Sequence, residues 1–572
     1  MASGHNPLTK EAAKHYEVVK DFKGINTRAS RNAIDKDEFA WLQDMMPIGP
    51  GNLPVVPQCS AQLAALGSGN ASYIKTVNLE YATTATFTAL AVPIAVPDST
   101  KFAVNDAVVF DTAVAPFVAG TTYYVVSKPD ATHIQIATSV GGAAVATGGV
   151  GGASTIHNLS QTVNYLIVFT ADGAAYAVDL ATNTVTTIGA AATFVGNSQI
   201  DQWKNERILI ASGNGYWDWD QVTLTHNTGL SAPGAATCIA SYQGRVWISF
   251  NRTVQGSRTD GGAGSTNFRD FTGTDSAIFI MTDPTLHSSI QTMLAANNFL
   301  YIFGEDSINV IGDVRSTNPV LFSNTNISAS VGTIYPMSVY AYLRGIWFAT
   351  KTGFYSLIGV TPNKISSELD GLVAQFNASN VISAGAVNIN NILCAAFAFY
   401  GSSNPYLGLG VAVYFDRKWF VSAQAGFSGS TMYIAGAVVN GKARMFAVNG
   451  HPTAAKVYEL FQNSTSVAVN VITALDPMQS AVFDKQATRC AIEVTNAAAG
   501  GITSTPVATI DSELLSKSLT FQAPPAGSPI YNLFRALAPI SGKYIGYSVN
   551  GTLNAGDTIN GFWTEYELRG AM

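Results

Sequence analysis

A run of five residues carries the most suggestive arrangement of reactive side chains in this sequence: Tyr216, Trp217, Asp218, Trp219 and Asp220. If this run is a β-strand, Asp218 and Asp220 point to the same face, about 7 Å apart. Paired carboxylates flanked by aromatic rings could bind a sugar or cleave a glycosidic bond, so the run is a candidate glycan or partner contact. The alternative is that the tryptophans pack between neighbouring sheets while the aspartates face solvent or cap a turn.

Other reactive patterns are missing from the sequence. It contains no GxxxxGKS/T, complete GxGxxG, GxSxG or HExxH motif, so phosphate-cradling, hydrolase and zinc-protease mechanisms lack their geometry. The four cysteines, Cys59, Cys238, Cys394 and Cys490, are widely spaced without a CxxC pattern. This spacing predicts buried thiols rather than a disulfide or zinc framework. We therefore expect no catalytic residue, no cofactor and no metal site, and we predict that the protein is not an enzyme.

One structural unit recurs from about residue 158 to residue 465. Each unit has an apolar strand, a tight turn, a second apolar strand, another turn and a third strand with aromatic residues. The second strands are centred 38 to 54 residues apart, at 166–168, 208–210, 246–248, 300–302, 346–348, 392–394 and 444–446. Six of these seven strands follow a short polar turn, at Asn205-Glu206, Gln243-Gly244, Asn297-Asn298, Arg344-Gly345, Asn390-Asn391 and Asn440-Gly441. Asn and Gly tolerate the positive φ that a two-residue hairpin turn requires.

Antiparallel strands that repeat with this period are typical of β-propeller blades. A single blade cannot bury both of its faces, so blades stack around an axis. We predict a mainly β protein with a β-propeller of six or seven blades. Trp217-Asp218 is a WD dipeptide, but the accompanying Gly-His signature of WD40 repeats is missing. A sandwich-like array of β-meanders remains the alternative.

Three further parts flank or interrupt the repeats. Residues 1–94 form an N-terminal platform segment with one helix-like stretch at 8–19, and residues 95–157 form an inserted small β domain that ends in a glycine-rich return. Residues 466–572 leave the repeat and alternate in polarity, which predicts a C-terminal β-sandwich. We expect the inserted domain to be separable from the remainder.

The charge content limits the partners of this protein. Charged residues make up 12% of the chain, about half the usual share, and 31 basic against 37 acidic residues give a net charge of -6. Because no Lys/Arg run stands out, any contact with DNA should be loose. Apolar stretches fall short of the ~20 residues that span a bilayer, and the N-terminus lacks an apolar signal region. We expect that the protein is synthesised in a cytoplasm and that it does not insert into a membrane.

Several short segments, in this order, resemble the tail nozzle proteins of short-tailed bacteriophages, also called the tail tubular protein B family. The segments are 21–27 (DFKGINT), 51–53 (GNL), 242–247 (YQGRVW), 265–268 (STNF), 300–308 (LYIFGEDSI) and 565–570 (EYELRG). The inserted domain, with its run Thr121 to Val126, is similar to small β domains found in many phage tail proteins.

This resemblance implies a hexameric ring whose N- and C-terminal regions form a β-rich platform and nozzle around a channel, with the propellers outside. Genomic DNA would leave the virion through this tail channel and contact it transiently. The implied partners are the adaptor or head-to-tail connector protein and tail fibres or tailspikes. The family's role is structural, so no catalytic residue carries over. The competing hypothesis is a carbohydrate-binding or glycoside-cleaving β-propeller that recognises a host surface polysaccharide.

Overall fold

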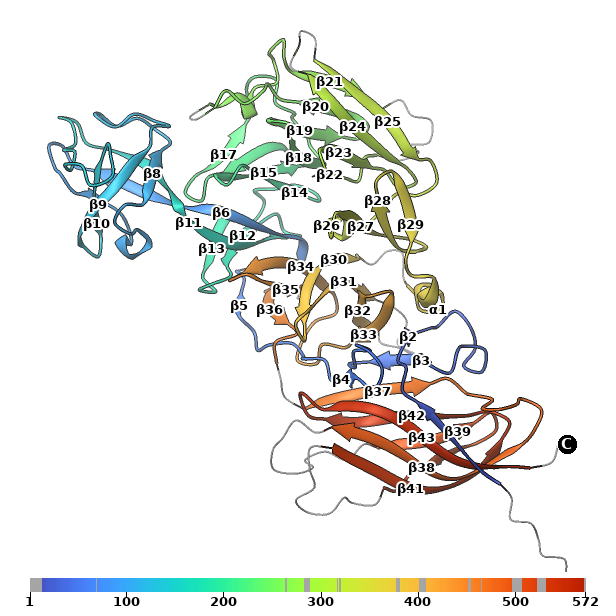
Figure 1. Cartoon of the computed structure of the whole chain (residues 1–572). Coiled ribbons are helices and arrows are strands. Elements are labelled where there is room, and N and C mark those ends of the chain that lie inside the picture. Colours follow the sequence, from blue (N-terminus) through green and yellow to red (C-terminus); the bar gives the residue numbers. More distant parts are fainter. Residues whose placement is uncertain are drawn as a thin grey trace, which may run out of the picture.

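The fold is described from a computed structural model, in which almost every element is a β-strand (Figure 1). It describes residues 13–67, 69–262, 265–281, 289–315, 317, 320–376, 381–400, 408–450, 454–463, 466–495, 507–521 and 531–569. Three bodies follow one another in space: a small module, a β-propeller and a two-layer sandwich. The short helix α1 (Asp370–Val373) and the 3-10 segments Ser99–Lys101, Asn267–Arg269, Pro336–Ser338 and Ser367–Leu369 lie in connections.

Seven four-stranded antiparallel blades can be traced in the described residues, which confirms the predicted β-propeller. Blade 1 contains β6 (Ala71–Phe87), β11 (Gly152–Thr170), β12 (Ala175–Asp179) and β13 (Val185–Gly189). Blade 2 contains β14 (Gln199–Trp203), β15 (Arg207–Ser212), β16 (Gly215–Trp219) and β17 (Leu224–Asn227). Blade 3 contains β18 (Cys238–Tyr242), β19 (Arg245–Phe250), β20 (Thr253–Gly256) and β21 (Ala277–Ile280). Blade 4 contains β22 (Thr292–Ala296), β23 (Phe299–Phe303), β24 (Ile308–Arg315) and β25 (Leu321–Ser328). Blade 5 contains β26 (Tyr340–Tyr342), β27 (Gly345–Thr350), β28 (Gly353–Ile358) and β29 (Thr361–Lys364). Blade 6 contains β30 (Ser383–Ile389), β31 (Ile392–Tyr400), β32 (Leu409–Phe415) and β33 (Lys418–Ser422). Blade 7 contains β34 (Met432–Val439), β35 (Lys442–Asn449), β36 (Lys456–Leu460) and β5 (Ala64–Ala65).

The predicted hairpin turns explain where most blades fold back. Both residues have positive φ at Gln243-Gly244, Asn297-Asn298, Asn390-Asn391 and Asn440-Gly441. Two turns differ from the prediction. In blade 5 the positive φ angles belong to Leu343 and Arg344, because Gly345 already begins β27. In blade 2 a three-residue loop, 204–206, replaces the two-residue turn, with Lys204 in the left-handed region.

The propeller closes through a strand from outside the repeat region. β5 pairs with β36 and completes blade 7, and β34 of that blade packs against β6 of blade 1. Residues between blades form separate apolar clusters; for example, Trp247 of blade 3 is fully buried against Leu300 and Ile302 of blade 4. The propeller therefore includes residues 64–65 and 71–80, which we had expected to belong to the N-terminal platform segment 1–94.

The inserted module sits at the tip of the long ribbon formed by β6 and β11 (Figure 1). Its other strands are β7 (Ile94–Ala95), β8 (Ala107–Phe110), β9 (Tyr123–Asp130) and β10 (His133–Ala137). Its core is a cluster of its own in which Phe87, Phe110 and Phe117 pack together. Because Phe87 belongs to this core, the module begins before the expected limit of residue 95.

The platform is a β-sandwich built from both terminal regions of the chain. One sheet contains β1 (Lys14–Val19), β4 (Leu53–Pro54), β38 (Lys485–Thr495), β41 (Tyr531–Gly542) and β43 (Thr558–Leu568). The other contains β2 (Gly24–Ile25), β3 (Glu38–Gln43), β37 (Val467–Thr473), β39 (Ala508–Ser512), β40 (Ser516–Ser518) and β42 (Ile545–Leu553). The C-terminal region therefore does not form a sandwich alone, since β1 and β3 complete its sheets.

The helix-like stretch predicted at 8–19 is wrong where it can be compared, and residues 8–12 lie outside the described residues. All six residues of β1 pair with β43, from Lys14 opposite Glu567 to Val19 opposite Phe562. Pairing with a long partner strand outweighs the local helix propensity of the segment. Among the described residues no helix has the length and apolar character to cross a bilayer.

Strand β3 joins the platform to the propeller. It pairs with β37 on one side and, through Gln43 and Val421, with β33 of blade 6 on the other, so that one ten-stranded sheet spans both bodies. The adjacent carboxylate of Asp44 is buried and accepts hydrogen bonds from Ser422 Oγ (2.6 Å) and Gln58 Nε2 (3.0 Å). A shared sheet and the buried polar contacts of Asp44 therefore join the platform to the propeller.

Candidate functional site

The first four residues of the candidate run, 216–219, lie on β16, the third strand of blade 2, and the aromatic side chains are used for packing. Tyr216 is buried and its hydroxyl donates to the Phe268 carbonyl at 3.2 Å. Trp219 is buried in the cluster between blades 1 and 2. Trp217 stacks on the His226 ring with centroids 3.8 Å apart. The indoles therefore belong to the propeller core and its rim.

The carboxylate of Asp218 is fully buried in a group of ionic contacts. Its Oδ1 accepts from Arg207 Nη1 (2.9 Å) and Arg269 Nη2 (2.7 Å). Its Oδ2 accepts from Arg269 Nε (2.9 Å) and Asn227 Nδ2 (2.8 Å). Two guanidinium groups and an amide thus occupy both oxygens, which leaves no access for a sugar.

Asp220 does not share a strand face with Asp218, because β16 ends at Trp219. Its Oδ1 accepts from the backbone N–H groups of Val222 (2.9 Å) and Thr223 (2.6 Å) and so caps the turn into β17. Turn capping was one of the open alternatives for this residue. The two carboxylates do not form the pair that glycosidic cleavage would need.

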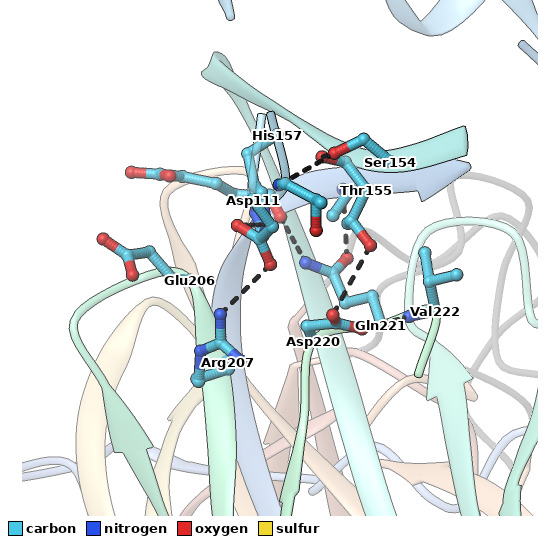
Figure 2. A network of polar contacts seen from close by, with 12 residues as sticks. Asp111, Ser154, Thr155, His157, Glu206, Arg207, Asp220, Gln221 and Val222 are labelled. Atoms are coloured by element: carbon cyan, nitrogen blue, oxygen red, sulfur yellow. Dashed lines mark hydrogen bonds and ion pairs between the residues drawn. The ribbon is translucent and has the colours of Figure 1, made fainter. Parts of the chain in front are cut away.

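A polar network that the sequence did not reveal connects blade 2 to the inserted module (Figure 2). Arg207 reaches Asp111 of the module through Nη2 at 3.1 Å, and Nε2 of His157 lies 3.0 Å from the other oxygen of Asp111. Burial alone would raise the pKa of Asp111, but His157 and Arg207 hold it below its ordinary value. Thr155 Oγ1 donates to Asp220 Oδ2 at 3.4 Å in the same network.

A cavity of about 360 Å³ lies on the propeller axis and is lined by residues of all seven innermost strands. Lys75 Nζ donates there to the Ile200 carbonyl and to Asp201 Oδ1, both at 2.9 Å. Burial alone would lower the pKa of Lys75, but the Asp201 carboxylate opposes this effect and the pKa is raised overall, so the ammonium stays charged. This volume suits a small molecule and excludes a nucleic-acid duplex. The propeller axis is therefore not a DNA conduit.

The outer face of the platform sheet formed by β1, β43, β38 and β41 carries an open groove of about 500 Å³. Its lining includes Tyr16, Arg489, Arg535, Leu537 and Trp563. Tyr16 and Leu537 are exposed there. This surface combines aromatic and aliphatic side chains with two arginines, which is the composition typical of protein interfaces.

The cysteines are the next reactive groups in the chain. All four cysteines are buried and free, as their spacing predicts, and burial raises the pKa of each thiol to about 12. Among the described residues no group of three or more His, Cys, Asp or Glu side chains could hold a metal ion.

Comparisons with known proteins find similarity at the level of structure. No protein-family model and no curated protein matches the chain. Among solved structures, the β-propeller domain of Cps50 (Swd1) from Myceliophteria thermophila is similar with a TM-score of 0.32 and 11% identity over 51% of this chain and 92% of that chain. The topology of the residues that the structure describes defines the fold class, a seven-bladed β-propeller joined to a β-sandwich platform.

Proposed function

We propose that the protein is a structural, ring-forming component of a short bacteriophage tail, the nozzle or tail tube through which genomic DNA is ejected. The observation that carries the proposal is the exposed apolar edge of the platform. Leu514, Leu515 and Leu537 are 78%, 62% and 74% exposed, and they belong to β41 and to the β39–β40 hairpin. Among the described residues, β40 and β41 are the last strands of their sheets, and this edge would pair with a neighbouring copy.

The propeller axis gives further support to a ring of several copies. Since its cavity is too small for a duplex, a DNA channel would have to lie between platforms of neighbouring subunits. The sheet shared through β3 would then hold each propeller outside the ring. Six copies, as the family resemblance implies, would carry a net charge of 6 × -6 = -36, which disfavours strong binding of passing phosphates.

The contacts of Asp218 and Asp220 favour this structural role over the carbohydrate hypothesis. Both carboxylates serve the fold, and the Trp217 ring is covered by His226 on one side. In the proposed role the protein belongs to the virion tail. Its partners are an adaptor or head-to-tail connector protein and tail fibres or tailspikes.

Electron microscopy of the purified full chain, combined with light scattering, tests the proposal. We expect six-fold rings, and weak duplex binding near 10⁻⁴ M at 150 mM salt. Leu537→Asp should shift the population toward monomers, because a charge would be buried in the subunit interface. Leu90→Asp is the matched control: Leu90 is 78% exposed but lies on the module. A wild-type monomer that binds glycans, or nanomolar binding to DNA, would contradict the proposal.

A further inference from the structure

The ribbon between propeller and module is interrupted at one point. Pairing of β6 with β11 runs without a break from Ile74 opposite Val168 to Glu80 opposite Thr162, and then resumes at Tyr81 opposite Asn158. Three residues, 159–161, are therefore left out of the ladder. Such a bulge removes ladder hydrogen bonds and bends the strand. The break separates the propeller half of the ribbon from the half that belongs to the module.

A side chain of blade 2 holds the ribbon at this break. Gln221, in the turn after β16, donates through Nε2 to the Glu80 carbonyl. Its Oε1 accepts from the Ala82 N–H at 3.3 Å and from the Tyr165 hydroxyl at 3.2 Å. Gln221 thus contacts residues on both sides of the interruption, and a rotation of the module would have to break these contacts.

A second attachment is the ion pair between Asp111 and Arg207, beside the longer hydrogen bond from Thr155 Oγ1 to Asp220 Oδ2 (Figure 2). Its partners come from the module and from blade 2, with side chains 27% and 10% exposed. If the module moved away, Arg207 would keep its contact with Asp218, and Asp111 would gain water. Opening therefore leaves no buried charge unpaired, and this keeps its free-energy cost low.

The apolar packing of the two bodies is separate. The module's hydrophobic cluster is built from residues between Tyr81 and Ile156, and no described residue of blade 2 belongs to it. Two bodies with their own cores, joined by a few polar contacts, are expected to move relative to each other.

We propose that the inserted module is a hinged arm. Residues 159–161 are the hinge, and the Asp111–Arg207 ion pair and Gln221 are a latch that holds the arm against blade 2. The inference concerns the single chain and does not depend on the proposed ring or on DNA ejection.

Distance measurement between two spin labels tests the hinge. The native cysteines are buried, so labels can be placed on the full chain at Ser139→Cys in the module and Thr228→Cys beside blade 2, both exposed positions. We expect a single narrow distance distribution for the parent chain. Asp111→Ala should broaden it or add a second distance, while Asp130→Ala, which removes an exposed carboxylate paired inside the module, should leave it unchanged.

A second variant, Gln221→Ala, keeps the test decisive if Asp111→Ala does not fold. It should broaden the distribution and accelerate amide exchange in residues 80–82 and 158–162. A broad distribution in the parent chain would overturn the latch. Unchanged distances and exchange in the folded variants would overturn the hinge.

Discussion

Replacing Asp218 with alanine distinguishes a structural carboxylate from a ligand-binding one. The fully buried side chain accepts four hydrogen bonds, two from Arg269 and one each from Arg207 and Asn227. Substitution removes every acceptor at once and leaves a cavity beside two cationic groups. We expect a large loss of folding stability in blade 2.

The magnitude depends on which partners can recover. Arg269 is 27% exposed and can bind water in place of the carboxylate, and Arg207 keeps Asp111. One arm of Arg207 and the amide of Asn227 are left without their acceptor. Breaking a buried ion pair from one side costs about 3 to 5 kcal/mol, and we expect the free energy of unfolding to fall by this amount. Asp220→Ala removes turn-capping bonds worth about 1 kcal/mol each and is the matched control.

Urea unfolding followed through tryptophan fluorescence measures both variants, since Trp217 and Trp219 lie on the same strand. A decrease below about 1 kcal/mol for Asp218→Ala would refute the assignment of this carboxylate to the ionic core. Loss of glycan binding without loss of stability would support the carbohydrate hypothesis instead.

Three further predictions concern the module, the thiols and the platform. Replacing residues 81–161 with Asn-Gly should leave a folded propeller with an unchanged unfolding transition, because Glu80 and Thr162 are directly opposite and a two-residue turn can join them; an insoluble product would contradict this. A thiol reagent at pH 8 should label none of the cysteines in the folded chain and all four in denaturant, since burial raises each pKa to about 12: Cys59, Cys238, Cys394 and Cys490. Burial alone would raise the pKa of Asp511, but its hydrogen bonds and Arg31 hold this pKa below the ordinary value of 3.8. The ionised carboxylate therefore stabilises the folded protein fully at a pH above 3.8, and this contribution is lost as the pH falls through the lower pKa of the folded state. Acid unfolding of Asp511→Asn should show a weaker pH dependence in this range, and an unchanged acid transition would contradict the assignment.

The repeat pattern predicted the propeller because the information is local. A two-residue hairpin turn requires positive φ, and Asn or Gly at 297–298, 390–391 and 440–441 marks such turns directly in the sequence. The closing strand β5 has two residues, and only its partner β36 makes it a strand. Strand β1 is likewise defined by β43, more than 500 residues away in the chain. Pairing at such separation leaves no local pattern to find.

The candidate site was harder to predict for the same reason. Residues 216–219 form the predicted strand, but Asp220 lies in the turn after it, and the contacts of Asp218 depend on Arg207 and Arg269, which come from other segments. Asp111 and Arg207 are 96 residues apart, and each is an ordinary charged residue in its own segment. The sequence showed the side chains, whereas their pairing depends on how the ribbon of β6 and β11 places the module beside blade 2.

The three bodies differ in how strongly they are joined, and this difference follows from the type of contact. The platform and the propeller share a sheet through β3, and the same N-terminal region supplies β5 to close blade 7. Separating these bodies would break backbone ladders and the buried contacts of Asp44, so they should respond to force as one unit. The module is attached to blade 2 by side chains that can be hydrated on opening. In the ring that we propose, the first joint would hold the platform and the propeller together, while the second would let the module adjust to a neighbouring protein.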